Sequence, residues 1–462
     1  MILSNYEWPS KSQTPVFSPR VPRPGPTVCL ALVILAGFLL FGPGRSYYVQ
    51  WSAIRKMQAA FLAKDYAEEF RQLSLLAKMG NRDAQGYLGA MYWRGEGTAR
   101  NDEQAVFWWR KSADGGNAEA QAALGQAYFT GRGVAKDDQL AASWAKKAAD
   151  KGNANGLYQL GTLYSQGQGL SKSDEQALYW WHKAADAGSV EAAYSLGQAY
   201  FNGLGVEKDN KMGVTWTRRA VDNGHPEAAY VLSKAYKFGL GVDKDSQLAA
   251  TWARKAADQG NADGQYMLGV LYHLGEGVAQ DDKLAVQWWT KAASSGVYQA
   301  QSALANAYAT GKGVARNDAE AASWWLRAAN QGDAYAQSSL GIAYLTGAGL
   351  PQSDENAVSW WLKAAKQGDA SAELNLGAAY ATGRGISKDE KSGEFWLLQA
   401  ARTGNVSAEL NLGKLYYSGI GGKPNYPEAG KWFVKAAGHG SEEAKAFLQL
   451  MKQNGQFDSK TL

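Results

Sequence analysis

One pattern recurs every 36 residues through most of this chain, and that spacing limits what the chain can fold into. A leucine stands at the same place in each of ten units, with a tyrosine four residues later and a tryptophan twenty residues later. A fixed period of this length without insertions indicates a solenoid, in which each unit buries its apolar face only against its neighbours. The leucines are Leu88, Leu124, Leu160, Leu196, Leu232, Leu268, Leu304, Leu340, Leu376 and Leu412.

Residues 117–152 show how one period can form two helices joined by short loops. Asn117 can cap a first helix, and Asp137 or Asp138 can cap a second. Gly131 can end the first helix, because glycine enters the left-handed conformation without strain at Cβ. Apolar residues recur at helical spacing, as Ala120, Leu124, Ala127 and Tyr128 in the first helix and Ala141, Trp144, Ala145 and Ala148 in the second.

This pattern closely resembles the Sel-one-like repeat (SLR) family, which is related to the tetratricopeptide repeats. The resemblance covers residues 81–440 ten times over, and its mild departures are Ser233, Ala305, Gly213 and Gly393. It implies an all-α, right-handed superhelical solenoid of helix-turn-helix repeats that serves as a protein-interaction scaffold. The motif residues in one repeat are Ala120, Leu124, Gly125, Tyr128, Gly131, Gly133, Val134, Asp137, Ala141, Trp144, Ala148 and Gly152.

The two ends of the repeat array differ from its interior, as solenoid ends do, because a terminal unit needs a polar outer face. We expect residues 45–80 to form an N-terminal capping region, with one long or broken helix over 46–79. We expect residues 441–462 to form a C-terminal capping helix and a polar tail.

The N-terminal residues predict a membrane anchor. No charged residue occurs in the 21 residues from 24 to 44, and residues 1–23 have the composition of a disordered segment. A window of this length is just sufficient for one transmembrane helix. A cleaved signal peptide is the main alternative, because the apolar core of 14 residues also fits that reading. A buried core helix is a third alternative.

The charges on either side of the apolar window give little information on which side of the membrane the solenoid lies. Positive charges flank both ends of it, so the positive-inside rule barely discriminates. We expect an uncleaved signal anchor in a bacterial inner membrane, with the solenoid exported to the periplasm. The bacterial assignment rests on the family resemblance and on the anchor.

No residue pattern supports catalysis, a cofactor or a metal. The four histidines share no spacing and have no companions that suggest a metal site. The Gly-x-Gly turns lack the strand-turn-helix context of a phosphate loop, and helix termination explains them. A net charge of +5 without a basic run does not indicate nucleic-acid binding. We therefore expect a non-enzymatic protein.

Tandem tryptophans in five repeats raise the question of sugar stacking. The second tryptophan of each pair falls in the column of Ala145, which a helical projection places on the buried face. We therefore interpret these pairs as core packing, and we expect the first tryptophan column, including Trp252, to lie in the core as well. The pairs begin at Trp108, Trp180, Trp288, Trp324 and Trp360.

The surface opposite the buried stripe of the first helices is the predicted binding face. Its residues vary from repeat to repeat while the packing columns do not, and an aromatic row there could clasp a peptide or a partner helix in a concave groove. The alternative is that these rings only pack against one another. The candidate partner-binding residues are Trp93, Phe129, Tyr158, Tyr194, Phe201, Tyr230, Tyr266 and His273.

The sequence as a whole predicts a membrane-anchored scaffold that organises other proteins in a bacterial envelope. One alternative is a signalling adaptor on the same anchor that faces the cytoplasm. Another is an accessory subunit that binds a glycan or a cell-wall enzyme. The sequence does not identify the partner.

Overall fold

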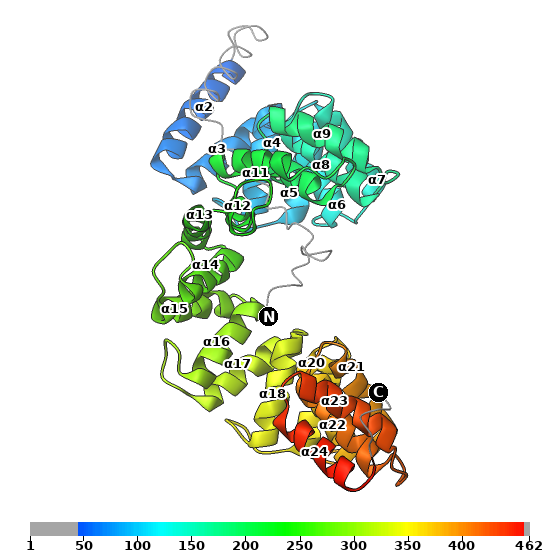
Figure 1. Cartoon of the computed structure of the whole chain (residues 1–462). Helices are drawn as coiled ribbons and strands as arrows, with labels where there is room; N and C mark the ends of the chain where they lie inside the picture. The colour runs from blue at the N-terminus through cyan, green and yellow to red at the C-terminus, as the bar shows by residue number, and fades with distance from the viewer. Residues whose placement is uncertain (1–44, 457–462) are drawn as a thin grey trace. The chain divides into compact units, whose positions relative to one another are not determined.

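The computed structural model describes residues 45–456, which form 23 α-helices (Figure 1). The predicted all-α repeat solenoid is therefore confirmed. The helices are α2 (Arg45–Ala63), α3 (Tyr66–Lys78), α4 (Arg82–Arg94), α5 (Asp102–Asp114), α6 (Ala118–Thr130), α7 (Asp138–Ala149), α8 (Ala154–Gln166), α9 (Asp174–Asp186), α10 (Val190–Asn202), α11 (Asn210–Asp222), α12 (Pro226–Phe238), α13 (Ser246–Asp258), α14 (Ala262–Leu274), α15 (Asp282–Ser294), α16 (Tyr298–Thr310), α17 (Asp318–Asn330), α18 (Ala334–Thr346), α19 (Asp354–Ala365), α20 (Ala370–Thr382), α21 (Glu390–Ala401), α22 (Val406–Ser418), α23 (Tyr426–Gly438) and α24 (Glu442–Gln453).

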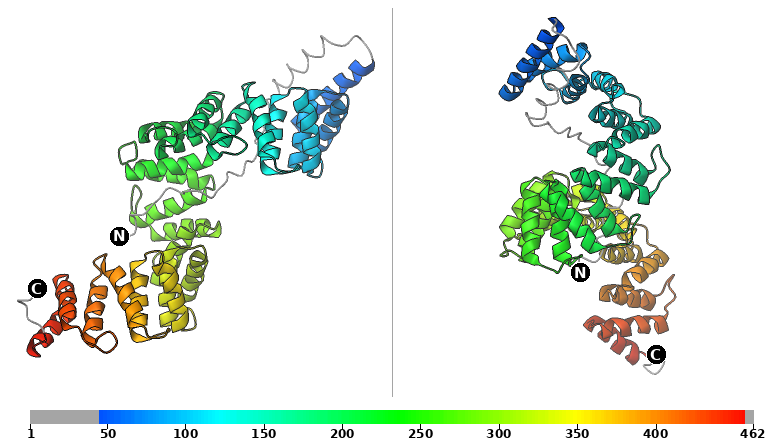
Figure 2. Two further views of the ribbon diagram at one scale, coloured as in Figure 1. Left: turned by 90° about the vertical axis from the view of Figure 1, so that its right-hand side faces the viewer. Right: turned by 90° about the horizontal axis from the view of Figure 1, so that it is seen from above.

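The chain divides into two compact units. The first comprises the residues up to Ala228 together with Leu240–Val242, and the second comprises Ala229–Gly239 together with the residues from Asp243 onward. Within each unit, successive helices pack against one another in chain order (Figure 2). From α4 onward, the even-numbered helices up to α22 are the first helices of the ten repeats, and the odd-numbered helices are the second helices.

Side-chain caps fix where the helices begin. The Asn117 side chain accepts a hydrogen bond of 2.8 Å from the Ala120 N–H, and the Asp137 side chain accepts bonds from the N–H groups of Gln139 and Leu140. Each cap satisfies backbone donors that lack a partner within the helix. The one first helix with a valine at this position, α16, has no such cap at Val297.

Two glycines shape the turn inside each repeat. Gly131 closes α6 in the left-handed conformation with φ of 68°, as predicted. Gly133 also has positive φ, at 73°, and a Cβ atom there would lie 2.3 Å from the Asp102 carbonyl oxygen in the preceding repeat. The turn therefore needs glycine both for its backbone conformation and for its close approach to the neighbouring repeat.

The glycine after each repeat leucine leaves room for a side chain of the second helix. A Cβ atom at Gly341 would lie 2.3 Å from Nε1 of Trp361, and Gly89 has the same relation to Trp109. Trp361 is buried, with 3% of its surface exposed. Core packing by the second tryptophan of each pair is thus confirmed where glycine is present. In the repeat where Ala305 replaces this glycine, Trp325 is only half-buried.

The first tryptophan column differs from its prediction except at Trp108, which is buried. Trp252 is half-buried rather than a core residue, and the Lys255 ammonium lies 5.1 Å from the centroid of its ring. The same arrangement recurs in other second helices, for example between Lys147 and Trp144 at 3.8 Å. The half-buried rings lie at the edge of the buried stripe, so one side of a ring such as that of Trp252 packs inward and the other lies near a cation.

Region 45–80 forms two helices, so of the two expected forms, one long helix or a broken one, the structure shows the broken one. Lys64, between α2 and α3, has φ of 55°, and the Asp65 side chain caps α3 by accepting a bond from the Glu68 N–H. Leu73 and Leu76 of α3 are buried. No helix between Arg45 and the end of α24 is long and apolar enough to span a membrane. The predicted anchor at 24–44 and segment 1–23 lie outside the described residues.

Candidate partner-binding face

The first helices of neighbouring repeats contact one another as well as their own second helices. Such contacts join α6 with α8 in the first unit and α20 with α22 in the second. We call the side of these helices that carries positions equivalent to 122, 126 and 129 the A-helix face. Groups on this face can therefore meet across repeats, as where the Ser195 hydroxyl lies 3.4 Å from the Tyr158 hydroxyl.

Three of the predicted site residues in the first unit are buried, which corrects the expectation of an exposed aromatic row. The exposed fractions are 6% for Trp93, 8% for Tyr158 and 1% for Phe201. Burial raises the pKa of the Tyr158 hydroxyl, and its contact with Ser195 only partly offsets that effect. The Arg132 guanidinium lies 3.5 Å from the centroid of the Trp93 ring.

The burial of Phe201 has a local cause in the sequence. A Cβ atom at Gly213 would lie 2.8 Å from the Phe201 ring, so the ring occupies the space that alanine fills at this position of most second helices. The Gly213 departure and the phenylalanine at 201 therefore compensate for each other. Phe201 is a packing residue here, because its ring turns into the core of its own repeat.

Tyr194 and Phe129 remain at the surface of the first unit. Both are half-buried. The Tyr194 ring stacks on the His225 ring with centroids 4.1 Å apart and an interplanar angle of 16°. His225 stands at a position where most repeats have a capping residue, and it also lies 3.1 Å from a Glu227 carboxylate oxygen.

The predicted residues of the second unit are all half-buried. Tyr230 has the Lys234 ammonium 5.2 Å from its ring centroid, and Tyr266 packs at the edge of the core. The Nδ1 atom of His273 lies 2.6 Å from a carboxylate oxygen of Asp282. These residues are thus partly accessible, but they are engaged with neighbours within the unit.

Two buried lysines on the A-helix face of α12 were missed as candidates. Lys234 and Lys237 are 6% and 5% exposed, and Lys237 forms an ion pair with Glu276 from the next repeat. Burial lowers the pKa of Lys234, while Asp263 acts in the opposite direction. A helical projection places lysine at these positions but does not reveal burial, because lysine is usually solvated.

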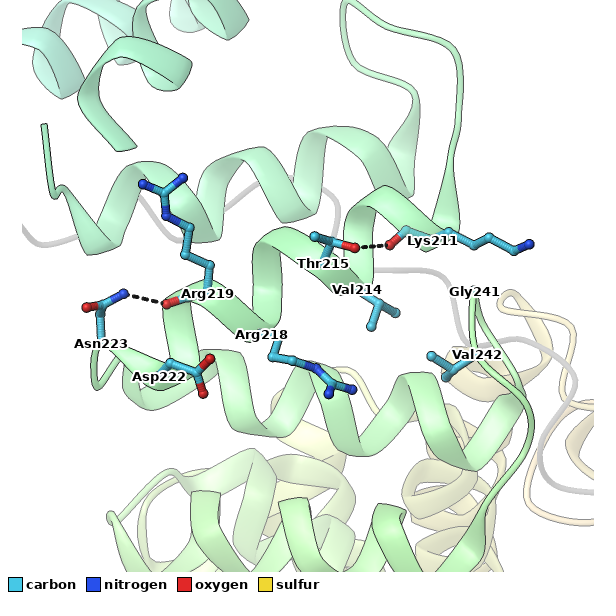
Figure 3. Close-up of a pocket in the computed structure, with 9 residues that line it drawn as sticks. All are labelled: Lys211, Val214, Thr215, Arg218, Arg219, Asp222, Asn223, Gly241 and Val242. Carbon is cyan, nitrogen blue, oxygen red and sulfur yellow. Dashed lines mark hydrogen bonds between the residues drawn. The ribbon is translucent and has the colours of Figure 1, made fainter. Parts of the chain in front are cut away.

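An open pocket of about 600 Å³ lies beside α11 (Figure 3). Its cations are partly engaged, since Arg219 donates a 2.7 Å hydrogen bond to the Ala185 carbonyl and lies 3.4 Å from Asp186. The Asn223 amide donates to the Arg219 carbonyl. Its lining residues are Lys211, Val214, Thr215, Arg218, Arg219, Asp222, Asn223, Gly241 and Val242.

In the described part of the chain, no three His, Cys, Asp or Glu side chains come together as potential metal ligands. The four histidines serve other contacts. His182 packs against Trp216 with ring centroids 5.1 Å apart, and burial lowers its pKa. His439 pairs with Glu409 at 2.8 Å. The predicted absence of cofactors and metals stays a prediction.

A family model described as the Sel1 repeat matches the chain ten times. The matches leave no gap longer than one residue across the repeat array and agree with the register assigned from the leucine spacing. The matched residues are 82–117, 118–153, 154–189, 190–225, 226–261, 262–297, 299–333, 334–369, 370–405 and 406–441.

Two solved structures of bacterial proteins are similar to this chain. The protein c5321, a protective antigen of uropathogenic Escherichia coli with an SLR fold, is 32% identical over 85% of this chain and 91% of its own, with a TM-score of 0.46. A Sel1 repeat protein from Oxalobacter formigenes is 32% identical over 67% of this chain and 90% of its own, with a TM-score of 0.53. No curated protein matches the chain.

Proposed function

Because the chain belongs to the Sel1 repeat family, whose fold is a non-catalytic repeat scaffold typical of protein–protein interaction, we propose that it is a non-enzymatic scaffold that binds a protein partner along its A-helix face. The scaffold organises this partner in a bacterial cell envelope. The segment 24–44 holds the chain in the inner membrane, and the solenoid lies in the periplasm. Regions 45–80 and 441–462 cap the repeat array.

The observation that supports partner binding is that positions on the A-helix face vary between repeats while the packing columns do not. The position of Phe129 holds serine, lysine, histidine, alanine, leucine or an aromatic residue in other repeats, while the leucine four residues before Tyr128 never changes. Packing alone would favour a repeated residue, because each unit meets the same neighbours. A face that is partly accessible and whose side chains change along the repeat array suits one asymmetric partner.

The test uses Tyr194→Ala and Tyr230→Ala together, in two separate units. A partner first identified by proximity labelling in living cells is purified and titrated against the full-length chain. We expect at least a tenfold loss of affinity, about 1.4 kcal/mol, because aromatic anchors dominate most interfaces. Helicity should be unchanged, and the melting temperature should fall only slightly because both rings are half-buried.

The matched control is Tyr179→Ala. Tyr179 is 48% exposed and lies on the second helix α9, where its ring packs edge-on against Trp180. This substitution also removes one surface tyrosine but leaves the A-helix face intact, so affinity should not change. An equal loss of affinity in the control, or a large fall in melting temperature without a specific loss of binding, would identify the aromatic row as packing.

A further inference from the structure

The first described helix, α2, has an outer face unlike that of a usual solenoid cap (Figure 1). Its inner face packs against α3, with Ala53 and Ala60 buried. Trp51 and Leu62 lie on the opposite face and are 46% and 72% exposed, and Leu62 is the most exposed large apolar side chain among the described residues. Because a terminal unit of a solenoid needs a polar outer face, these apolar side chains indicate a surface that another body covers.

The exposed side chains form one stripe along α2. Trp51, Arg55 and Leu62 are spaced by four and seven residues, which places them on one side of an α-helix. The Arg55 guanidinium lies 4.7 Å from the centroid of the Trp51 ring, so the two side chains meet on the surface. Lys56 is also exposed and flanks the stripe. The stripe therefore combines two apolar side chains with cations.

The charge of this region has one sign. Residues 45–64 contain Arg45, Arg55, Lys56 and Lys64 and no aspartate or glutamate. The helix that caps the other end of the array, α24, carries two glutamates and two lysines instead. A basic helix face with exposed tryptophan and leucine is complementary to an anionic lipid surface, where cations contact phosphates and apolar side chains enter the boundary of the acyl chains.

The sequence directly before α2 favours the same partner. The helix begins at Arg45, where the uncharged window 24–44 ends. If that window spans the membrane, the start of α2 is held at the membrane surface. Tryptophan is enriched at such membrane–water interfaces, which suits Trp51 in the second turn of the helix. From this start, α2 could either lie along the surface or rise from it as a continuation of the anchor.

We propose that α2 lies flat on an anionic lipid bilayer, with Trp51 and Leu62 inserted and Arg55 and Lys56 in contact with lipid phosphates. The inference rests on the anchor in the proposed function and applies on either side of the membrane. The flat and upright arrangements differ most at the far end of α2. Leu62 follows Arg45 by 17 residues, so it would lie about 26 Å above the surface if the helix stood upright.

The experiment places an environment-sensitive fluorophore at position 62. Leu62→Cys is combined with Cys29→Ala, which removes the one native cysteine, and the labelled full-length chain is reconstituted into vesicles of phosphatidylethanolamine and phosphatidylglycerol. We expect blue-shifted emission that a spin-labelled lipid quenches and aqueous iodide does not. The matched control is Leu140→Cys, at an exposed leucine of α7 in the same unit, where the label should stay accessible to iodide.

Charge variants test the class of lipid. Arg55→Gln and Lys56→Gln replace exposed cations and should leave helicity unchanged. Each cation near an anionic surface favours binding about fivefold, so the double variant should lower the ratio of bound to released α2 about thirtyfold. Phosphatidylcholine vesicles should also release α2 of the unaltered chain. The matched control is Lys146→Gln with Lys147→Gln, because these exposed lysines of α7 include one that lies 3.8 Å from the ring centroid of Trp144.

A carbonate wash at high pH separates this inference from the proposed anchor, since it retains a membrane-spanning chain and releases a peripheral one. A label in water at position 62 would overturn the flat helix, and carbonate resistance of the same chain would still retain the anchor. An immersed label on a chain that carbonate releases would support the α2 surface and reject the anchor.

Three further results would overturn the proposal. Equal blue shifts at positions 62 and 140 would show that the label itself enters the lipid. Immersion that depends neither on the two cations nor on phosphatidylglycerol would reject an anionic surface. A blue shift without vesicles that grows with protein concentration would assign the stripe to a second copy of the chain.

Discussion

A ladder of glutamines joins successive repeats at the residue scale. Gln301 donates from its side-chain amide to the Ala293 carbonyl and accepts a 2.9 Å hydrogen bond from Gln331 in the same repeat. Gln337 repeats this pattern one period later, with the Ala329 carbonyl and Gln367. Glutamine suits the position because it presents both a donor and an acceptor when buried.

The last two positions of this ladder are glutamates. Glu373 is 8% exposed, and burial raises the pKa of its carboxyl, as does Asp369, against an opposing effect of Arg402. Glu409 is fully buried but lies 3.1 Å from Lys435 and 2.8 Å from His439. The buried carboxylate at this position is therefore well compensated at Glu409 and poorly compensated at Glu373.

Glu373→Gln should stabilise the protein at neutral pH. A carboxyl whose pKa is raised on folding favours the folded state when protonated, so its contribution declines as pH rises from the unfolded-state pKa through the higher folded-state pKa. Glutamine removes this loss of stability at neutral pH. Its side-chain amide can donate to the Ala365 carbonyl, as Gln301 and Gln337 donate to the corresponding alanine carbonyls. We expect a gain of about 0.5–1.5 kcal/mol in denaturant unfolding at pH 7. The gain should shrink as pH falls towards 4.

Glu409→Gln is the control for that prediction, since it changes the same atoms one repeat later. It removes a buried carboxylate that pairs with the Lys435 ammonium and hydrogen-bonds with His439, so it should destabilise the protein by about 1–3 kcal/mol at pH 7. If both substitutions stabilise the protein, the contacts of Glu409 contribute nothing to its stability. If both destabilise it, the buried charge of Glu373 is not unfavourable.

At the scale of helices, one glycine per repeat sets the distance between the two helices of a pair. Gly341 lets the Trp361 ring lie directly over the first helix, and Nε1 of Trp361 donates a 3.3 Å hydrogen bond to the Ser338 carbonyl. Where alanine stands in place of this glycine, at 305, the corresponding tryptophan is less buried. The glycine and the tryptophan thus act as a pair rather than as independent sites.

A double-mutant cycle should measure this pairing. Gly341→Ala alone should cost about 1–3 kcal/mol, because the added methyl overlaps the ring. Trp361→Ala alone should cost about 3–5 kcal/mol through lost burial and the cavity left behind. In the Trp361→Ala background, Gly341→Ala should cost little, giving a coupling energy above 1 kcal/mol. Strictly additive losses in thermal and denaturant unfolding would contradict this packing.

Trp252→Ala tests the correction made to the first tryptophan column. Trp252 is half-buried, so its loss should cost about 1–2 kcal/mol, less than that of the buried Trp361. Lys255→Met, which removes the cation near the ring and keeps its stem, should cost under 1 kcal/mol. If Trp252→Ala lowers the free energy of unfolding as much as Trp361→Ala does, Trp252 is a core residue after all.

At the scale of the whole molecule, the proposed topology makes a direct prediction. If 24–44 is an uncleaved signal anchor, an alkaline phosphatase fused after the last repeat should be active in a bacterial host, because that enzyme folds only when exported. The mature chain should also keep its N-terminal peptide in mass spectrometry. An inactive phosphatase with an active cytoplasmic reporter would reverse the orientation, and a mature chain that begins at Arg45 would indicate a cleaved signal peptide.

The sequence by itself determined the repeat architecture. The 36-residue spacing gives the repeat unit, the caps such as Asn117 and the glycines such as Gly131 act within one or two turns of helix, and the structure confirms each of them. Burial of the second tryptophan was also predictable for every pair except Trp324-Trp325, since it follows from helical periodicity. These features are local, so the order of residues is sufficient to specify them.

Only the tertiary structure decided which side chains of the A-helix face are accessible. The burial of Phe201 depends on the missing Cβ at Gly213, and the open amide atoms of Gln126 and Gln159 depend on how α6 meets α8. A helical projection assigns each residue to a face but not to its neighbour on another helix. Contacts between different helices, within a repeat for Phe201 and between repeats for Gln126 and Gln159, set burial and hydrogen bonding there.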